Sequence, residues 1–574
     1  MRTKCSVHME FIDTTAIADA TVTAAGNVSF GNLELFDELT GQKDYGTLEL
    51  NQFILDGSKE ILPVAAPDVA FWSDSASDEE TCLSEETRLE IDFTKPHTSA
   101  GIKLYFAGEY PAAIKITWYS LAGSKLVEES FYPDSLEYFC DRQVEGYGKI
   151  VIQFLNTLFP ERYVKLQYIK YGIELDWAGA EVISASVDEE MDVTGATLGI
   201  NTADIEIADQ KREFDPSMPD GRWKSIQKSQ MATITETIDG VDHGCGVFYI
   251  DSHDWKENAA SFQLIDRIGY MDRTYFYGGR IYENEPAGTI IAEIMQSVGI
   301  EDYTVDEEIA VIPLSGYLAT QTHRSALQQV VFACGAVADC SRSERVKIFV
   351  PDREIRADIG TDRKFLGTSI SLDEYVSGVS ISYNKYTRSA ETTEIFNGEI
   401  PAGDYRIEFS GPYAPESLEV SGGTIVEACT NYTLIHAETA GECVVTGYGY
   451  DVVENTYTAS VAQLDAGEVE NIKSYTACTL VNAARVPEIA EHILNYLQLR
   501  QIVTMEYLNK GEVVGQWVNI MDRNQSACTT GITSQKLDLT GGNVASVTCR
   551  GYSRVVTNYY YCGEFYAGET GGVL

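Results

Sequence analysis

Residues 486–497 read VPEIAEHILNYL, and residues 501–552 continue as QIVTMEYLNKGEVVGQWVNIMDRNQSACTTGITSQKLDLTGGNVASVTCRGY. In the first stretch apolar residues return at helical spacing, and Pro487 stands where proline favours a first helical turn. The second stretch alternates apolar and polar residues and is broken at Lys510-Gly511 and Gly541-Gly542, as strands joined by turns are. This order predicts a helix that leads into a small closed or sandwiched β-unit.

The length and charge of the chain limit its class. Its 574 residues are too many for one hydrophobic core, so about three to five domains are expected. It carries 42 Lys and Arg against 87 Asp and Glu, a formal net charge of −45. This excludes a general basic footprint for nucleic acid. The acidity fits either ordinary solubility or a surface lining a passage through which DNA slides without sticking.

Cysteine usage and hydropathy bear on the compartment. The 12 cysteines are scattered through a large chain without a CxxC pair, which indicates reduced thiols in a protein assembled in a cytosol, although an even count leaves disulfides open. The opening MRTKCSVHMEF lacks the apolar run of a signal peptide, and no run of about 18 apolar residues would span a membrane. If the protein leaves a cell, we expect it to do so by lysis and not by secretion.

The fold class is mainly β with a small α/β insert, because aromatic and β-branched residues dominate alternating segments. The expected segments are a docking segment at 1–65, a β-sandwich at 66–176, a β-barrel at 177–285, the α/β insert at 286–370, a second β-unit of 371–395 with 473–552, an inserted β-sandwich-like module at 396–472 and a tail at 553–574.

The segment 66–176 shows short strands at near-regular spacing, which is typical of a sandwich or jelly roll. One strand is expected to bury Ile114, Ile116 and Trp118 and to turn the residues between them outward. The pattern resembles the galactose-binding-like sandwich of discoidin-type modules. That resemblance implies either sugar binding or a structural role.

The segment 286–370 changes to a helical period. A helix is expected to begin at Pro286 and to stop at Gly299, and a second to stop at Gly335. Between them, EEIAVIPLSG is expected to be a strand, and VKIFVP after the second helix another. These signals predict a small α/β unit between β-units.

A resemblance covers most of residues 30–552. It is carried by ASVDEEMDVTGATLGINTADIEIAD (185–209), HRSALQQVVFACGAVADCSRSERVKIF (323–349), RKFLGTSISLDEYVSGVSISYNKY (363–386), LQLRQIVTMEYLNKGEVVGQWVNI (497–520) and GITSQKLDLTGGNVASVTCRGY (531–552). Their order resembles the tail or baseplate hub proteins of siphophages and prophages of Gram-positive bacteria, and more distantly the central hubs of phage tails and phage-like injection particles. The match is one of pattern, without a short catalytic signature.

The resemblance implies a virion structural protein. Hubs of this type contain two related β-barrels with an α/β insert and assemble as homotrimers, so that a closed ring matches the sixfold tail tube. The implied partners are the distal tail or tail tube protein, the tape measure protein and a tip fibre or spike protein. The ring would line the channel for DNA ejection at the virion tail tip, after assembly in the host cytoplasm, and genome DNA would pass without specific binding.

A search for enzyme and metal motifs finds none that is specific. HExxH, GxSxG and P-loop signatures are missing, and runs such as Asp188-Glu189-Glu190 place neighbouring carboxylates apart, so we expect solvated turns and no enzyme. Asp239, Asp242, His243 and Cys245 bring oxygen, imidazole and thiol groups close in sequence, and His253 with its flanking aspartates repeats the idea. Their spacing matches no known site, so no metal and no cofactor is predicted.

Two groups of aromatic residues are candidates for binding. In the sandwich, Trp72 is expected in a loop before the first strand, where it could stack on host cell-wall glycan. Trp118, Tyr119 and Tyr132 are further aromatic candidates in the same segment. In the tail, an aromatic cluster is expected either to dock on a partner or to form a last edge strand. It consists of Tyr559, Tyr560, Tyr561 and Phe565.

Three functions therefore stand side by side. The first is a structural, non-enzymatic tail hub. The second is a glycan-binding tail adhesin or receptor-binding protein. The third is a tail-associated cell-wall hydrolase whose site the sequence does not reveal.

Overall fold

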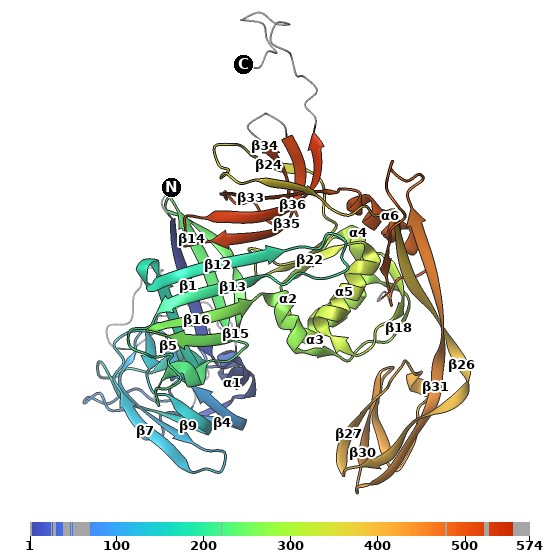
Figure 1. Ribbon diagram of the computed structural model, residues 1–574. Helices are drawn as coiled ribbons and strands as arrows, with labels where there is room; N and C mark the ends of the chain where they lie inside the picture. Colours follow the sequence, from blue (N-terminus) through green and yellow to red (C-terminus); the bar gives the residue numbers. More distant parts are fainter. Residues whose placement is uncertain are drawn as a thin grey trace, which may run out of the picture.

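The computed structural model describes residues 3–24, 26, 30–37, 46–47, 49, 69–219, 221–476, 479–521 and 527–554. Within these residues the protein is mainly β and multidomain, and none of its several sheets closes on itself. Figure 1 shows a central sheet with helices beside it, a two-sheet unit on one side and a long two-stranded ribbon on the other. In this part of the chain no helix has the length and apolar character that crossing a membrane requires.

A sheet of 13 strands joins residues from the beginning, the middle and the end of the chain. Its first group consists of β1 (Thr3–Ile12), β11 (Gly172–Ala178), β12 (Val182–Glu190), β13 (Thr202–Ala208), β14 (Met231–Ile238), β15 (Val241–Lys256) and β16 (Ala259–Ile265). Its second group consists of β24 (Ile355–Ile359), β25 (Ser369–Leu372), β33 (Gln501–Leu508), β34 (Trp517–Met521), β35 (Ala527–Asp538) and β36 (Val544–Arg554). The strand order is β11-β1-β14-β15-β16-β13-β12-β35-β36-β33-β25, with β34 between β24 and β35.

The two groups meet at β12 and β35. These strands pair antiparallel, with the buried Val187 opposite the buried Leu537. The other half of β35 pairs with β34. Where the resemblance implies two separate β-barrels, the described residues form one open sheet, because one half of β35 pairs with β12 and the other half with β34.

The beginning of the chain differs from the expected docking segment. β1 lies inside the large sheet between β11 and β14, because Val7, Met9 and Phe11 alternate and fill its core. The short α1 (Thr14–Asp19) follows, with Asp13 as its N-cap. β2 (Thr21–Ala24) then pairs with the two-sheet unit, and η1 (Leu33–Asp37) comes after it.

The two-sheet unit has the sandwich arrangement expected of 66–176. One sheet has the order β2-β4-β9-β6-β7, with β4 (Arg88–Ser99), β6 (Pro111–Tyr119), β7 (Lys125–Phe131) and β9 (Val144–Thr157). The other has the order β3-β10-β5-β8, with β3 (Phe71–Trp72), β5 (Ile102–Phe106), β8 (Glu137–Cys140) and β10 (Lys165–Lys170). Ile114, Ile116 and Trp118 are buried between the sheets, as predicted. The unit ends at β10, since β11 belongs to the large sheet, with η2 (Gly179–Glu181) behind it.

The helices pack together beside the large sheet. They are α2 (Arg267–Tyr270), α3 (Ala287–Val298), α4 (Glu307–Ala310), α5 (His323–Cys334) and α6 (Val486–Leu497), with η4 (Met271–Arg273) directly after α2. The short η3 (Arg222–Ser225) instead contacts β4 of the two-sheet unit. The predicted stops are confirmed, because Gly299 and Gly335 end α3 and α5 with φ of 75° and 67°, the left-handed region that glycine favours. Short strands accompany them: β17 (Tyr275–Phe276), β18 (Ile281–Pro286), β19 (Tyr303–Val305), β20 (Pro313–Tyr317), β21 (Gln321–Thr322), β22 (Val337–Asp339) and β23 (Val346–Phe349).

Two expectations about this insert are wrong. The stretch EEIAVIPLSG was expected to be one strand, but its first residues form α4 and only its end forms β20, because Asp306 begins a helical turn. The insert was expected to reach residue 370, but β24 and β25 already belong to the large sheet.

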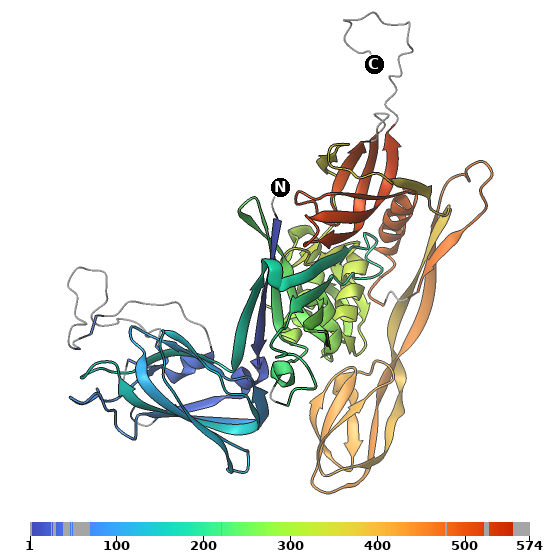
Figure 2. The ribbon, with the colours of Figure 1, turned by 60° about the vertical axis from the view of Figure 1, so that its left-hand side comes forward.

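A long ribbon leaves this body. β26 (Gly378–Ile400) and β31 (Gly441–Ser460) pair along nearly their whole length, and β32 (Ile472–Tyr475) joins β26 at its base. A small module lies at the far end, formed by β27 (Gly403–Glu408), η5 (Pro415–Ser417), β28 (Glu419–Ser421), β29 (Thr424–Ala428) and β30 (Tyr432–Ala437). The sequence predicts that residues 371–395 form one β-unit with residues 473–552. This is wrong for most of the range, because β26 pairs mainly with β31. Within the described residues, only the pairing of β25 with β33 and that of β26 with β32 connect the two ranges. Figure 2 shows the ribbon carrying the module away from the C-terminal strands.

The module returns to the helical body at one point. The side-chain Nδ2 of Asn431 donates to the carbonyl oxygens of Gly279 at 2.7 Å and Leu318 at 3.0 Å, and its Oδ1 accepts from the hydroxyl of Tyr317 at 2.7 Å. Beside it, the guanidinium of Arg406 lies 4.3 Å from the ring centre of Tyr277. The ribbon is thus tied at both ends.

Candidate functional site

The most unusual surface lies at the free edge of the large sheet. β25 is the last strand in the order, and all four of its residues are exposed. Ile370 and Leu372 share one face of the strand, and Phe365 and Leu366 precede it, with Leu366 81% exposed. We call these four side chains the edge patch. Unpaired strand edges with apolar side chains are rare on proteins that work alone, so this surface is a candidate for contact with another chain.

The residues around the edge patch are firmly held. The backbone N–H of Phe365 donates to the carbonyl oxygen of Glu506 at 2.9 Å, and that of Asp373 donates to the carbonyl oxygen of Arg500 at 2.8 Å. The carboxylate of Asp373 also pairs with the guanidinium of Arg550. The patch therefore stands on fixed backbone, and its exposure is a property of the fold.

A buried polar network fixes the junction that presents this edge. Glu189 on β12 is 2% exposed and its Oε1 lies 2.5 Å from the Nε of Arg342 in the helical insert. The Nε2 of Gln535 on β35 donates to the other carboxylate oxygen of Glu189 at 3.1 Å. Burial raises the pKa of Glu189 in spite of the facing guanidinium. The prediction that this acidic run is a solvated turn is wrong for Glu189, which joins both strand groups to the insert.

A second buried acid lies nearby without such a partner. Glu236 on β14 is 2% exposed, and its Oε1 accepts no hydrogen bond in the described part of the chain. Burial raises the pKa of Glu236 to about 7, against a smaller opposing effect of Arg342. It lines a hollow of about 580 Å³ together with His243 and Cys245. Neutral Glu236 is thus the form that the fold prefers.

The stretch from Asp239 to Cys245 consists of a tight turn and the beginning of β15. Asp239 and Gly240 have φ of 48° and 89° and connect β14 to β15. Asp242 accepts from the hydroxyl of Thr237 at 2.7 Å, and burial raises the pKa of the Cys245 thiol to about 12. Among the described residues these side chains do not converge as metal ligands.

The second histidine candidate is also dispersed. His253 contacts the carbonyl oxygen of Phe214 at 3.1 Å through Nε2. Asp251 pairs instead with Arg273 at 2.9 Å. The aspartates that flank His253 in sequence therefore do not form one site with it.

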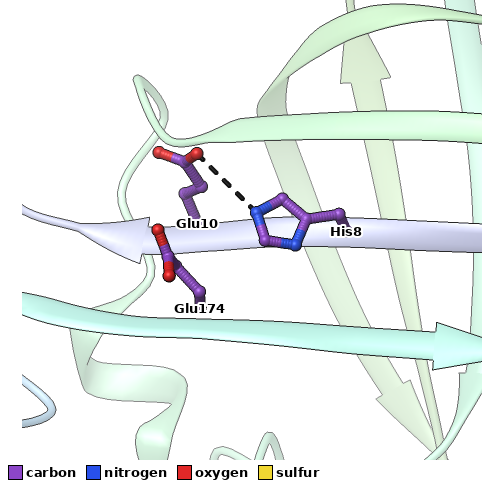
Figure 3. A group of neighbouring side chains, drawn as sticks. All are labelled: His8, Glu10 and Glu174. Carbon is purple, nitrogen blue, oxygen red and sulfur yellow. Dashed lines mark ion pairs between the residues drawn. The ribbon is translucent and has the colours of Figure 1, made fainter. Parts of the chain in front are cut away.

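His8, Glu10 and Glu174 are the one group among the described residues whose ligand atoms all lie within 4.8 Å of one another (Figure 3). Both oxygens of Glu174 are already engaged, by the ammonium of Lys103 at 2.6 Å and by that of Lys170. A divalent cation would have to displace two positive charges, so we interpret this cluster as a salt-bridge network that joins β1 and β11 to Lys103 of β5 and Lys170 of β10.

Trp72 does not lie where the sequence predicts. It is in β3, paired with β10, and is 7% exposed. Its ring packs against Phe30 and Tyr163, with centroids 5.5 and 6.4 Å apart, and the ammonium of Lys165 lies 4.7 Å from its centre. The expectation of an exposed loop tryptophan is wrong, because β3 closes the second sheet of the sandwich. Trp118 is buried, as expected.

The aromatic candidates of the tail cannot be placed. Tyr559, Tyr560, Tyr561 and Phe565 lie outside the described residues. The 10 cysteines that the structure describes are unbridged. The edge patch and the pairing of Glu189 with Arg342 were not predicted. The alternation of Ile370 and Leu372 with Ser369 and Ser371 was the available signal for the edge patch, whereas the partners of Glu189 lie far from it in sequence.

Comparison with solved structures finds phage tail proteins. The tail protein from Neisseria meningitidis MC58 has a TM-score of 0.40 and 9% identity, over 66% of this chain and 93% of that chain. The 43 kDa tail protein of prophage MuSo2 from Shewanella oneidensis has a TM-score of 0.39 and 11% identity, over 65% of this chain and 95% of that chain. Prophage tail protein gp18 from Listeria monocytogenes EGD-e has a TM-score of 0.36 and 7% identity, over 66% of this chain and 91% of that chain. No protein-family model and no curated protein matches the sequence.

Proposed function

We propose that this protein is a non-enzymatic structural hub of a phage tail or phage-like particle. Three copies form a ring at the tail tip that joins the sixfold tail tube to the distal tip. The edge patch carries this proposal, because a strand edge with four exposed apolar side chains is covered most simply by another copy of the chain. Contact between this edge and a different surface of the next copy closes a ring of three when successive copies are related by a third of a turn.

In this proposal the two strand groups of the large sheet are the counterparts of the two hub barrels. The two-sheet unit is the galactose-binding-like sandwich, and the ribbon with its module is an external addition. The ring contacts the tail tube or distal tail protein on one face and the spike or fibre on the other, and the tape measure ends inside. The net charge of −45 suits a channel that DNA crosses without binding.

Electron microscopy of the purified full-length protein tests the ring. Class averages are expected to show threefold symmetry around an open centre, with the sandwich and the module projecting outward. Single particles the size of one chain, or twofold dimers joined edge to edge, would contradict the proposal.

A charge placed on the edge patch tests which surface closes the ring. Leu366→Glu is expected to yield single chains, because a carboxylate cannot be buried at an apolar contact without a large cost. Val469→Glu is the matched control, since Val469 is 75% exposed and lies outside the edge patch, in the loop before β32. Rings that survive Leu366→Glu as well as Val469→Glu would place the interface elsewhere.

A further inference from the structure

The outer face of the sandwich sheet β4-β9-β6-β7 carries polar side chains in ordered rows. Arg88, Gln153 and Lys115 lie side by side on three neighbouring strands. In the third row along the same face, Lys149 lies beside Tyr119. The opposite face of these strands is the apolar core, so the alternation of the strands turns all these polar groups outward.

These rows line a groove of about 620 Å³. Its floor between the outer rows is Val151 and Thr117, and Gly123 in the β6–β7 turn lies at one border. Four strands about 4.8 Å apart and three rows about 6.8 Å apart give a platform of roughly 14 by 14 Å. This is the extent of a short oligosaccharide rather than of a single small ion.

Several donors in the groove are free for a ligand. Within the described residues, the ammonium of Lys115, the side-chain amide of Gln153 and the hydroxyl of Tyr119 have no hydrogen-bond or ion-pair partner. In contrast, Glu90 holds the Nε of Arg88 at 2.9 Å and the Nζ of Lys149 at 2.7 Å. The carboxylate of Glu90 is fixed by these two contacts. The groups left for a ligand are those of Lys115, Gln153 and Tyr119.

The chemistry of the groove selects the class of ligand. Three basic residues face three acidic ones, Glu85, Glu90 and Glu128, so the groove is balanced in a chain of net charge −45. A balanced surface does not attract a nucleic acid, and a floor with few apolar side chains does not suit a protein partner. An amide, an ammonium and acid oxygens beside a half-buried aromatic ring match the hydroxyls and the apolar face of a sugar.

We infer that this groove binds a saccharide chain. Gln153 and Lys115 hydrogen-bond its hydroxyl groups, and Tyr119 offers its ring to a sugar face. The inference goes beyond the proposed hub function and is independent of it, because the groove lies within one chain and away from the edge patch. It moves the glycan contact from the buried Trp72 to the outer face of the sandwich.

Binding of the full-length protein to a panel of purified oligosaccharides and bacterial cell-wall polysaccharides tests the inference, with polyphosphate as a non-saccharide anion. Lys115→Ala and Tyr119→Ala are each expected to weaken binding of the recognised saccharide about tenfold. Lys95→Ala and Tyr132→Ala are the matched controls, because both residues are exposed on the same unit outside the groove, Tyr132 at 69%.

The binding results of the groove variants and of the control variants together decide the inference. Saccharide binding that falls in both groove variants and persists in both controls supports the inference. No binding to any saccharide, binding that falls in Tyr132→Ala instead, or Lys115-dependent binding of polyphosphate alone would overturn it. Melting curves of the four variants establish that each is folded, and particle mass reports on the ring separately.

Discussion

At the scale of single residues, the junction between the two strand groups depends on one buried ion pair. Adjacent residues of β12 make opposite kinds of contact: Glu189 is buried against Arg342, whereas Asp188 pairs with Lys536 at 2.7 Å on the exposed side. Burying a charge is costly unless its partner remains, whereas an exposed pair contributes little. The two pairs therefore form a comparison within one strand.

Arg342→Met is expected to lower the free energy of unfolding by about 3–5 kcal/mol, because it leaves Glu189 buried without its cation. Lys536→Met is expected to change it by less than about 1 kcal/mol. Urea unfolding followed by circular dichroism measures both. Equal effects would show that the buried pair does not hold the junction.

Glu236 makes stability depend on pH. Its folded pKa of about 7 lies above the ordinary value of 4.5, so the protonated acid stabilises the fold fully below pH 4.5, and this contribution is lost as the pH rises toward 7. Glu236→Gln keeps a neutral side chain and is expected to be more stable than the unmodified chain by about 2 kcal/mol at pH 8, with a small difference at pH 4.5.

Unfolding at the two pH values measures this difference, with Glu454→Gln on the exposed ribbon as the control. A Glu236→Gln variant that is no more stable than the unmodified chain at pH 8 would show that burial does not raise the pKa of Glu236.

At the scale of elements, the ribbon and its module are held to the body by Asn431. Asn431→Ala removes three hydrogen bonds and leaves the carbonyl groups of Gly279 and Leu318 without these donors. The module keeps its own core, formed by residues such as Ile407 and Ile435. We therefore expect the module to stay folded but to lose its attachment.

Hydrogen exchange is expected to increase in residues 277–281 and 315–320 of the Asn431→Ala variant and to stay unchanged within β30. Asn397→Ala, on the exposed ribbon, is the control and is expected to change neither region. Increased exchange throughout the module would instead mean that Asn431 is needed for its folding.

Local signals predicted some elements well and others poorly. Helices α3, α5 and α6 follow from short-range information: an apolar stripe, a proline at the start or a glycine at the stop. The pairing of β26 with β31 does not, because each strand alternates in the same way with any partner, and the sequence does not state which partner it meets. For the same reason β1 was predicted as part of an N-terminal docking segment. The alternation of Val7, Met9 and Phe11 indicates a strand but does not show that β11 and β14 are its partners.

The candidate sites show the same limit. The sequence predicts Trp72 in a loop because β3 has only two residues, too few to show alternation. Its strand conformation comes from pairing with β10. Glu189 reads as a solvated acid because Arg342, its partner, comes from a different segment. Lys115 lies on the outward face, as predicted for the residues between Ile114, Ile116 and Trp118, since strand alternation is a local property.

At the scale of the whole molecule, one open sheet connects the start and the end of the chain and ends in an apolar edge. The sandwich and the ribbon extend from opposite sides of this body (Figures 1 and 2). Such additions leave the edge accessible to another copy. We therefore expect three copies to close a ring through this edge.

Light scattering of the purified protein at two concentrations measures how many copies a particle contains. The expected mass is three times that of the 63.4 kDa chain at both concentrations, and that of a single chain for Leu366→Glu. A single-chain or two-chain mass for the unmodified protein at both concentrations would contradict it.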